Sequence, residues 1–244
     1  MGLKEAGLRG SLRNVSTVSA IPDSGDTHQW PYSEGEGTTV EDVIGDLDGT
    51  INGASWVEDS DAVGGHVLRF DGDEDNVNID ATTDLNPEES SFSYAITIDI
   101  DSTDPTQVAV NQISTQSTDH LLSLGTHDGN EWFWGVMVDG NSQLLSLESN
   151  TSESLPNQGK VRVLGTWDHE EQDGDLYING EVDSNDAGTD VTDMTSGSSP
   201  GVHRHGNDDN NNRPINADLD NPAVWANKVD SNTALDDYNE QPWS

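Results

Sequence analysis

Four carboxylates crowd around one glycine between residues 71 and 75, where the chain reads Asp71-Gly72-Asp73-Glu74-Asp75. Calcium takes about six to eight oxygen ligands, so a loop this rich in carboxylates is a candidate calcium site. The loop is not an EF-hand, because Thr82 stands at its twelfth position, where that motif has glutamate. The alternative is that these acids are ordinary solvated surface, since acidic residues occur all along the chain.

A second candidate is the segment His203-Arg204-His205, whose alternation puts both imidazoles on one strand face. Two imidazoles do not complete a metal site, although Asp208 and Asp209 could add ligands. We favour a solvated loop rim, because the stretch 206–213 is dense in Asn and Asp. Exposed loops commonly carry binding residues, so we predict receptor or ligand contacts by His203, His205, Asn207, Asp208 and Asn210.

The elements that must position these residues are β-strands. Residues 92–100 alternate between apolar and polar side chains, the period of a strand with one buried face. Hairpins are expected around Asp139-Gly140 and Asn179-Gly180, both typical two-residue turns. Further strands are predicted at 66–70, 77–79, 108–113, 121–124, 161–167 and 217–225, and a short helical turn at 234–238.

Alternating aromatic residues mark the strand at 132–138. Trp132 and Trp134 share a face, which we assign to the core, as we do Trp167 and Trp225. Phe133 lies on the opposite face, where an aromatic ring can be a stacking platform for sugar rings. The sequence leaves its role open.

The composition is strongly acidic: 47 Asp and Glu oppose nine Lys and Arg, a formal net charge of -38. Such self-repulsion destabilises a compact body at low salt, whereas concentrated salt screens charges within about 3 Å at 1 M. We therefore predict a protein from a halophile. The acids are interleaved with apolar residues, which excludes an acidic disordered tail, and nucleic acid binding is not expected from a surface without a basic footprint.

The 244 residues include no cysteine, so disulfides and thiol chemistry are excluded. Residues 1–15 lack the apolar run of a secretory signal, and no segment has the length of a membrane span. We therefore expect neither export nor membrane insertion.

Residues 1–22 differ in character from the rest. They carry an apolar stripe and three basic side chains, which predict an arm that anchors the protein in an assembly: Leu3, Lys4, Leu8, Arg9, Leu12 and Arg13. The alternative is a frayed terminus.

Several short motifs occur in a distinctive order: Trp30 before Glu34-Gly35, the run 48–54, Gly65 followed by 68–73, then 165–168, 176–180 and 217–220 leading to Trp225. In this order they resemble the laminin G-like, concanavalin A-like jelly-roll domains, of the kind found in proteins of halophilic archaea and their viruses. The resemblance implies an all-β sandwich of two antiparallel sheets over residues 23–244, preceded by the arm. It also implies glycan or protein binding and a calcium site near Asp71, Asp73 and Asp75, with Asp218 and Asp220 on a neighbouring strand.

Some relatives with this jelly roll hydrolyse polysaccharides with a strand-borne Glu-x-Asp-x-x-Glu. The nearest approach here is the segment 171–176, where Leu176 takes the last acidic place and the composition indicates a turn. No serine-hydrolase elbow or phosphate loop appears. We therefore expect no enzymatic activity.

These observations favour a non-enzymatic accessory protein of a halophilic virus particle, on head or tail, assembled in the host cytoplasm and exposed on the particle. Its partners would be other virion proteins, further copies of itself, and a host cell-surface glycan or glycoprotein. The alternatives are a purely structural capsid decoration and a glycan-active enzyme.

Overall fold

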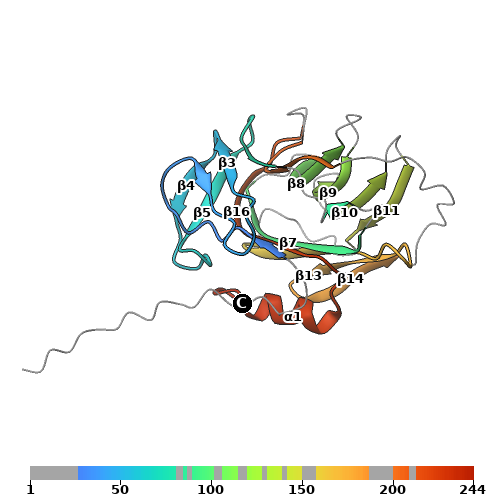
Figure 1. Cartoon of the computed structure of the whole chain (residues 1–244). Helices are drawn as coiled ribbons and strands as arrows, with labels where there is room; N and C mark the ends of the chain where they lie inside the picture. Colours follow the sequence, from blue (N-terminus) through green and yellow to red (C-terminus); the bar gives the residue numbers. More distant parts are fainter. Residues whose placement is uncertain are drawn as a thin grey trace, which may run out of the picture.

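The computed structural model describes residues 27–80, 85–86, 90–101, 106–114, 120–127, 131–138, 142–149, 158–186, 200–208 and 213–244. Within them, sixteen strands form two antiparallel eight-stranded sheets that pack face to face, with one helix outside (Figure 1). This is the predicted all-β sandwich.

The first sheet runs in the order β14-β13-β12-β7-β16-β5-β4, and β1 pairs with β16 at the side of this path. Its strands are β1 (Thr27–Gln29), β4 (Ser55–Glu58), β5 (His66–Asp71), β7 (Phe92–Ile100), β12 (Val161–Trp167), β13 (Gly174–Ile178), β14 (Glu181–Asp186) and β16 (Asn216–Trp225).

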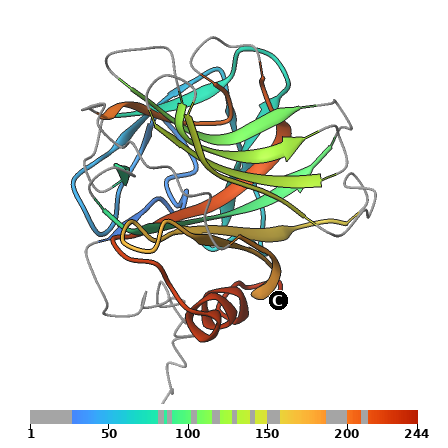
Figure 2. The same cartoon turned by 90° about the vertical axis from the view of Figure 1, so that its right-hand side faces the viewer.

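The second sheet runs in the order β11-β10-β9-β8-β15-β6-β3-β2. Its strands are β2 (Thr39–Val40), β3 (Gly49–Asn52), β6 (Asn76–Ile79), β8 (Gln107–Ser114), β9 (His120–His127), β10 (Glu131–Val138), β11 (Ser142–Glu148) and β15 (Pro200–His205). Figure 2 shows the two sheets stacked, with the helix below the first sheet.

Apolar side chains from the two inner faces form one large core between the sheets. The alternation along β10 sends Trp132 and Trp134 inward, where both are buried, and leaves Phe133 on the outer face, where it is half-buried. Trp167 is buried in the same core, and Trp225 is buried in a smaller cluster on the other side of the first sheet.

The helix α1 (Ser231–Asn239) covers that smaller cluster. It begins at Asp230, whose carboxylate accepts a hydrogen bond from the Thr233 N–H and caps the first turn. Beneath it lie Ala95, Leu164, Tyr177, Ala223 and Trp225, which share the cluster with Ala234 of the helix. In the part of the chain that the structure describes, no helix is long and apolar enough to cross a membrane.

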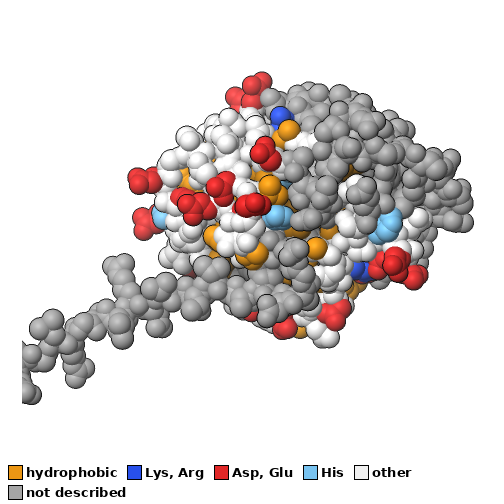
Figure 3. Space-filling model, viewed as in Figure 1, with side chains coloured by type: hydrophobic (Ala, Val, Ile, Leu, Met, Phe, Trp, Pro, Cys, Tyr) orange, Lys and Arg blue, Asp and Glu red, His pale blue; other side chains and the backbone are white. Residues whose placement is uncertain are grey.

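Acidic side chains are spread over the face that carries β3, β4 and β5 rather than gathered at one end (Figure 3). A carboxylate surface of this kind follows from the excess of acids over bases, because few basic side chains are present to neutralise them.

Candidate functional site

The outer face of the second sheet carries a row of polar residues in register. Thr50 of β3 pairs with Asn78 of β6, Asn78 pairs with Arg204 of β15, and Arg204 pairs with Asn111 of β8. Directly opposed residues on one sheet face have close side chains. The row therefore aligns a hydroxyl, two amides and a guanidinium across four neighbouring strands.

A hollow of about 390 Å³ lies over the β3–β6–β15 end of this row. It is lined by Asp48, Thr50, Asn52, Asn78, Ile79, Asp80, Val202 and Arg204. Two atoms of the described residues that line it, Oδ1 of Asn78 and Nε of Arg204, are buried and have no hydrogen-bond partner. Buried polar atoms normally have partners, so this hollow offers one acceptor and one donor that a ligand can satisfy. We call it the polar hollow.

Asn52 also lines a second hollow of about 510 Å³, together with Gly53, Asp71, Asp73, Glu74 and Asp75. We call this the acidic hollow. The Asn52 amide donates to Oδ1 of Asn76 at 3.1 Å, which fixes the side chain that the two hollows share.

The predicted calcium residues Asp71, Asp73 and Asp75 all line the acidic hollow. Two of their carboxylates already accept backbone hydrogen bonds: Asp71 from the Asp73 N–H and Asp75 from the Asp71 N–H. Burial raises the pKa of Asp75, and the charges of Asp71 and Asp73 raise it further. Within the described ranges, however, no three His, Asp or Glu side chains are grouped so that they could hold a metal ion.

The structure does not bring Asp218 and Asp220 into that hollow. Asp218 lies on the outer face of the first sheet and accepts two hydrogen bonds from the Arg69 guanidinium. Asp220 lies two residues along β16 and is 1 % exposed, with Oδ2 accepting the Val63 N–H at 3.0 Å. Burial raises the pKa of Asp220 to about 7. The five predicted residues therefore do not line one hollow, because Asp218 is bound to Arg69 and Asp220 is buried against the Val63 N–H.

The predicted exposure of His203 and His205 is wrong. Both imidazoles point inward from β15 and are fully buried, because the same alternation that sends Arg204 outward sends its neighbours into the core. They offer no surface to a receptor. What the segment presents outward instead is Val202 and Arg204, which line the polar hollow.

Two tyrosines give these buried imidazoles hydrogen-bond partners at three of their four ring nitrogens. The Tyr94 hydroxyl lies 2.9 Å from Nε2 of His203 and 2.8 Å from Nε2 of His205, and the Tyr32 hydroxyl lies 2.8 Å from Nδ1 of His205. Burial lowers the pKa of His203 to about 3, with a smaller contribution from His28, and it lowers the pKa of His205 well below its usual value. The pair is therefore neutral and structural.

The remaining predicted binding residues lie next to this strand. Asn207 and Asp208 are buried, and the Asp208 carbonyl accepts a hydrogen bond from Nη1 of Arg204 at 2.9 Å. Asp208 therefore helps to position Arg204, which lines the polar hollow. Asn210 lies outside the described residues, as do Leu3, Lys4, Leu8, Arg9, Leu12 and Arg13 of the predicted arm.

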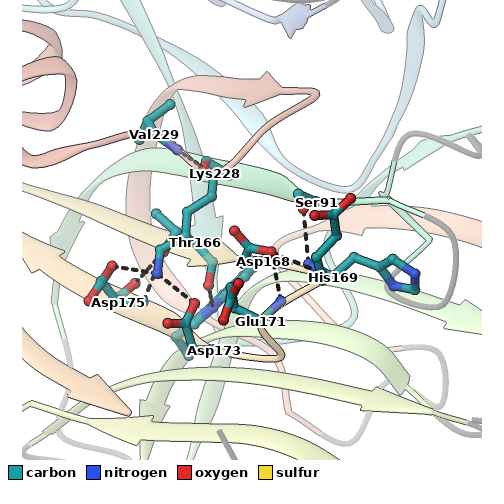
Figure 4. A network of polar contacts seen from close by, with 12 residues as sticks. Ser91, Thr166, Asp168, His169, Glu171, Asp173, Asp175, Lys228 and Val229 are labelled. Carbon is teal, nitrogen blue, oxygen red and sulfur yellow. Dashed lines mark hydrogen bonds and ion pairs between the residues drawn. The ribbon is translucent and has the colours of Figure 1, made fainter. Parts of the chain in front are cut away.

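The segment compared with the glycosidase motif, 171–176, is a turn only in its first half, because residues 174–176 belong to β13. Figure 4 shows the polar network around it. Lys228 binds Asp173 at 2.7 Å and Asp175 at 3.1 Å. Asp168 accepts the backbone N–H groups of Glu170 and Glu171. These carboxylates hold the turn together, beside a small hollow of about 370 Å³ that Asp168 and Lys228 also line.

Sequence reasoning did not single out Thr50, Asn52 or Asn78. Each is an ordinary polar residue on the outer face of a strand, and the signal that joins them is the pairing of β3, β6 and β15, which are far apart in the chain.

The sequence profile of Laminin_G_3, described as the concanavalin A-like lectin/glucanases superfamily, matches residues 71–233. A search of curated proteins finds no match to the sequence.

Similar folds occur among solved structures. A Trypanosoma rangeli sialidase in complex with sialic acid has a TM-score of 0.66 at 16% identity, over 90% of this chain and 33% of that one. The binding domain of Paraclostridial Mosquitocidal Protein 1 has a TM-score of 0.66 at 12% identity, over 90% of this chain and 53% of that one. The botulinum neurotoxin serotype D ligand binding domain in complex with N-acetylneuraminic acid has a TM-score of 0.65 at 14% identity, over 88% of this chain and 50% of that one. The chain thus spans a third to about half of these proteins, and the likeness concerns the fold.

Proposed function

Because the chain belongs to the concanavalin A-like lectin/glucanase superfamily, we propose that it is a non-enzymatic carbohydrate-binding protein whose polar hollow binds a neutral glycan. The observation that carries this proposal is the row Thr50, Asn78 and Arg204, aligned across three strands above a hollow with an unsatisfied acceptor and donor. Sugar hydroxyls both donate and accept hydrogen bonds, so they suit a surface that offers both kinds of atom.

Charge favours a neutral sugar over an anionic one. Of the described residues that line the polar hollow, Arg204 is the only cation. Asp48 and Asp80 line it too, and the acidic hollow adjoins it through Asn52. A carboxylate sugar would meet like charge at close range, which costs binding free energy. Although two structural neighbours were solved with sialic acid or N-acetylneuraminic acid, we expect this chain to prefer uncharged sugars.

We expect no hydrolytic activity, because the carboxylates nearest to a catalytic motif in sequence make the ion pairs and hydrogen bonds that stabilise a turn. Asp173 and Asp175 pair with Lys228, and Asp168 caps backbone N–H groups. A glycan-active enzyme is the alternative, and release of reducing ends from neutral polysaccharides would reveal it.

Isothermal titration calorimetry with neutral oligosaccharides of glucose, galactose and mannose tests glycan binding, with sialyllactose as the anionic comparison. We expect at least one neutral sugar to bind and Arg204→Ala to weaken it about tenfold, the effect of losing one charged hydrogen bond. Arg69→Ala is the matched control, because it removes an equal charge from an exposed side chain on the first sheet, outside the hollow. Equal loss in both variants, or no binding by the unchanged protein, would refute the proposal.

The setting we propose for this activity is the surface of a halophilic virus particle, with the glycan on the host cell or on a host glycoprotein. The net charge of -38 supports the saline environment, and the apolar and basic residues of segment 1–22 support an anchor to other virion proteins and to further copies of the chain. Deletion of residues 1–20 should abolish incorporation into particles and spare the fold. If particles that lack the protein adsorb to host cells as well as particles that carry it, the capsid-decoration alternative is favoured.

Calcium remains a narrower proposal, confined to the acidic hollow. Asp71, Asp73 and Asp75 line it without being grouped as metal ligands. A cation that drew them together would offset both the burial and the neighbouring charges that raise the pKa of Asp75. Calorimetric unfolding with calcium and with a chelator, at fixed high salt, tests it, because an ion that binds only the folded state raises stability. Identical unfolding in both solutions would show that these acids are solvated surface residues that bind no calcium.

A further inference from the structure

Phe133 stands out on the outer face of the second sheet because its neighbours in the chain are core residues. It points away from Trp132 and Trp134 and pairs across β10 and β11 with Glu148 and across β10 and β9 with Gly125. It is only half-buried. An aromatic side chain in this position has either a packing role or a ligand.

The ring lies along the sheet and covers the backbone of Gly135. A Cβ atom at position 135 would be 2.5 Å from Cζ of Phe133, so any larger residue there would push the ring away. Gly125, directly opposite Phe133, also lacks a side chain. The Phe133 ring therefore occupies the space that a side chain at position 135 would need.

Two polar side chains flank the ring. The His127 ring centroid is 6.1 Å from that of Phe133, and Nδ1 of His127 is 3.0 Å from Oε1 of Glu148. The side chains of His127 and Glu148 are 45% and 47% exposed. Both can therefore exchange hydrogen bonds with a ligand that lies on the ring.

We propose that Phe133, His127 and Glu148 form a second sugar subsite, which binds a neutral pyranose by stacking its C–H face on the Phe133 ring. The face of an aromatic ring carries negative charge density, which attracts the weakly positive C–H groups of a sugar. Glu148 accepts a hydrogen bond from a hydroxyl at the sugar's edge, and its charge disfavours an anionic sugar. This inference rests on the proposed function, since it assigns a further contact to the same class of ligand.

The two subsites lie on one face of one sheet. From β15, the nearest strand of the polar hollow, to β10 the order β15-β8-β9-β10 spans three strand spacings, or about 14 Å. Sugars held at both places within one glycan would bind more tightly than either alone, because the second contact becomes intramolecular. The ligand class is therefore an oligosaccharide rather than a monosaccharide.

The test is calorimetric titration of the full chain with neutral oligosaccharides of increasing length, using Phe133→Leu and Phe133→Trp. Leucine covers the glycines but has no planar face, whereas tryptophan keeps one. We expect Phe133→Leu to weaken binding of the longer sugars about fivefold or more, and Phe133→Trp to bind at least as well as the unchanged protein. Val182→Ala, an exposed apolar side chain on the other sheet, should bind normally.

Thermal unfolding and saturation-transfer NMR separate binding from packing. Saturation transfer from aromatic protons to the sugar should be strong with the unchanged protein and be lost in Phe133→Leu at an unchanged melting temperature. If Phe133→Leu binds normally while Arg204→Ala does not, the aromatic subsite is wrong and the proposed function stands. If neither variant changes binding, or if no sugar binds, both proposals fail. A Phe133→Leu variant that melts earlier but binds normally would show that the ring only covers the glycines.

Discussion

Arg162 and Asp237 form a buried, two-pronged ion pair, in which Nε of Arg162 lies 2.8 Å from Oδ2 of Asp237 and Nη2 lies 2.9 Å from Oδ1. Arg162 belongs to β12 and Asp237 to α1. Nη1 of the same guanidinium donates to the Asn221 carbonyl at 2.6 Å. One side chain therefore fastens the helix and the β16 bulge to the outer face of the first sheet.

Removal of the Asp237 carboxylate should destabilise the protein strongly. Asp237→Ala leaves the Arg162 charge buried without its partner, a change that costs about 3 to 5 kcal/mol. Chemical unfolding at about 2 M KCl measures this loss, with the exposed Asp236→Asn as the control from the same helix. Similar unfolding midpoints for the two variants would contradict a structural role for the pair.

Acidification should destabilise the core through its histidines. The pKa of His203 is lowered to about 3 and that of His205 well below its usual value, so the unfolded chain takes up protons below about pH 6.5 that the folded chain does not. His203 then lowers the free energy of unfolding by about 1.4 kcal/mol per pH unit as pH falls from about 6.5 toward 3. His205 acts in the same direction. His203→Gln should remove the contribution of one proton from this pH dependence, which is about 1.4 kcal/mol per pH unit. An unchanged slope would mean that His203 is protonated in the fold.

Asp220 should act in the opposite direction. Its pKa is raised to about 7 by burial, so between about pH 4 and 7 the folded state holds a proton that the unfolded state has released. Its contribution to stability is therefore lost as pH rises from about 4 to about 7, at about 1.4 kcal/mol per pH unit. Asp220→Asn cannot titrate at this position. Relative to the unchanged protein, its free energy of unfolding should therefore increase from about pH 4 to 7, and the difference between the two proteins should be constant above about pH 8. A difference that does not vary with pH would overturn this assignment.

Stability should depend steeply on salt. With a net charge of -38, dilution from about 2 M to 0.1 M KCl lengthens the screening distance to about 10 Å and lets surface carboxylates repel one another. We expect a lower melting temperature at 0.1 M KCl, measured by circular dichroism. Potassium gluconate at equal ionic strength is the control for anion effects, and equal melting temperatures at both salt concentrations would contradict the halophilic assignment.

The strands that the sequence predicts best are those whose alternation is long and regular. The predicted limits of β7 and β12 agree with the structure residue for residue, and the β13–β14 turn has Asn179 and Gly180 at positive φ as a two-residue hairpin requires. The strands β1 to β4 are two to four residues long, too short for a period to show. Their place in the sheets depends on partners distant in the chain.

The candidate sites were predicted less well, for a related reason. The acidic segment 71–75 does line one hollow, because its carboxylates are neighbours in the chain. His203 and His205 were predicted at an exposed rim because the segment after them is polar, yet their tyrosine partners lie at positions 32 and 94. A buried histidine pair is stable only where such partners exist, and no local pattern reveals them.

The sequence by itself determined the sandwich, the inward tryptophans and the acidic surface, since alternation, turn residues and charge balance are local properties. The tertiary structure decided which polar residues share a site. Strand pairing brought Thr50, Asn78 and Arg204 into one row, and it put Asp218 opposite Arg69, outside the hollow that Asp73 lines. Backbone hydrogen bonds between distant segments fix that register, so a side chain's neighbours across a sheet cannot be read from its neighbours along the chain.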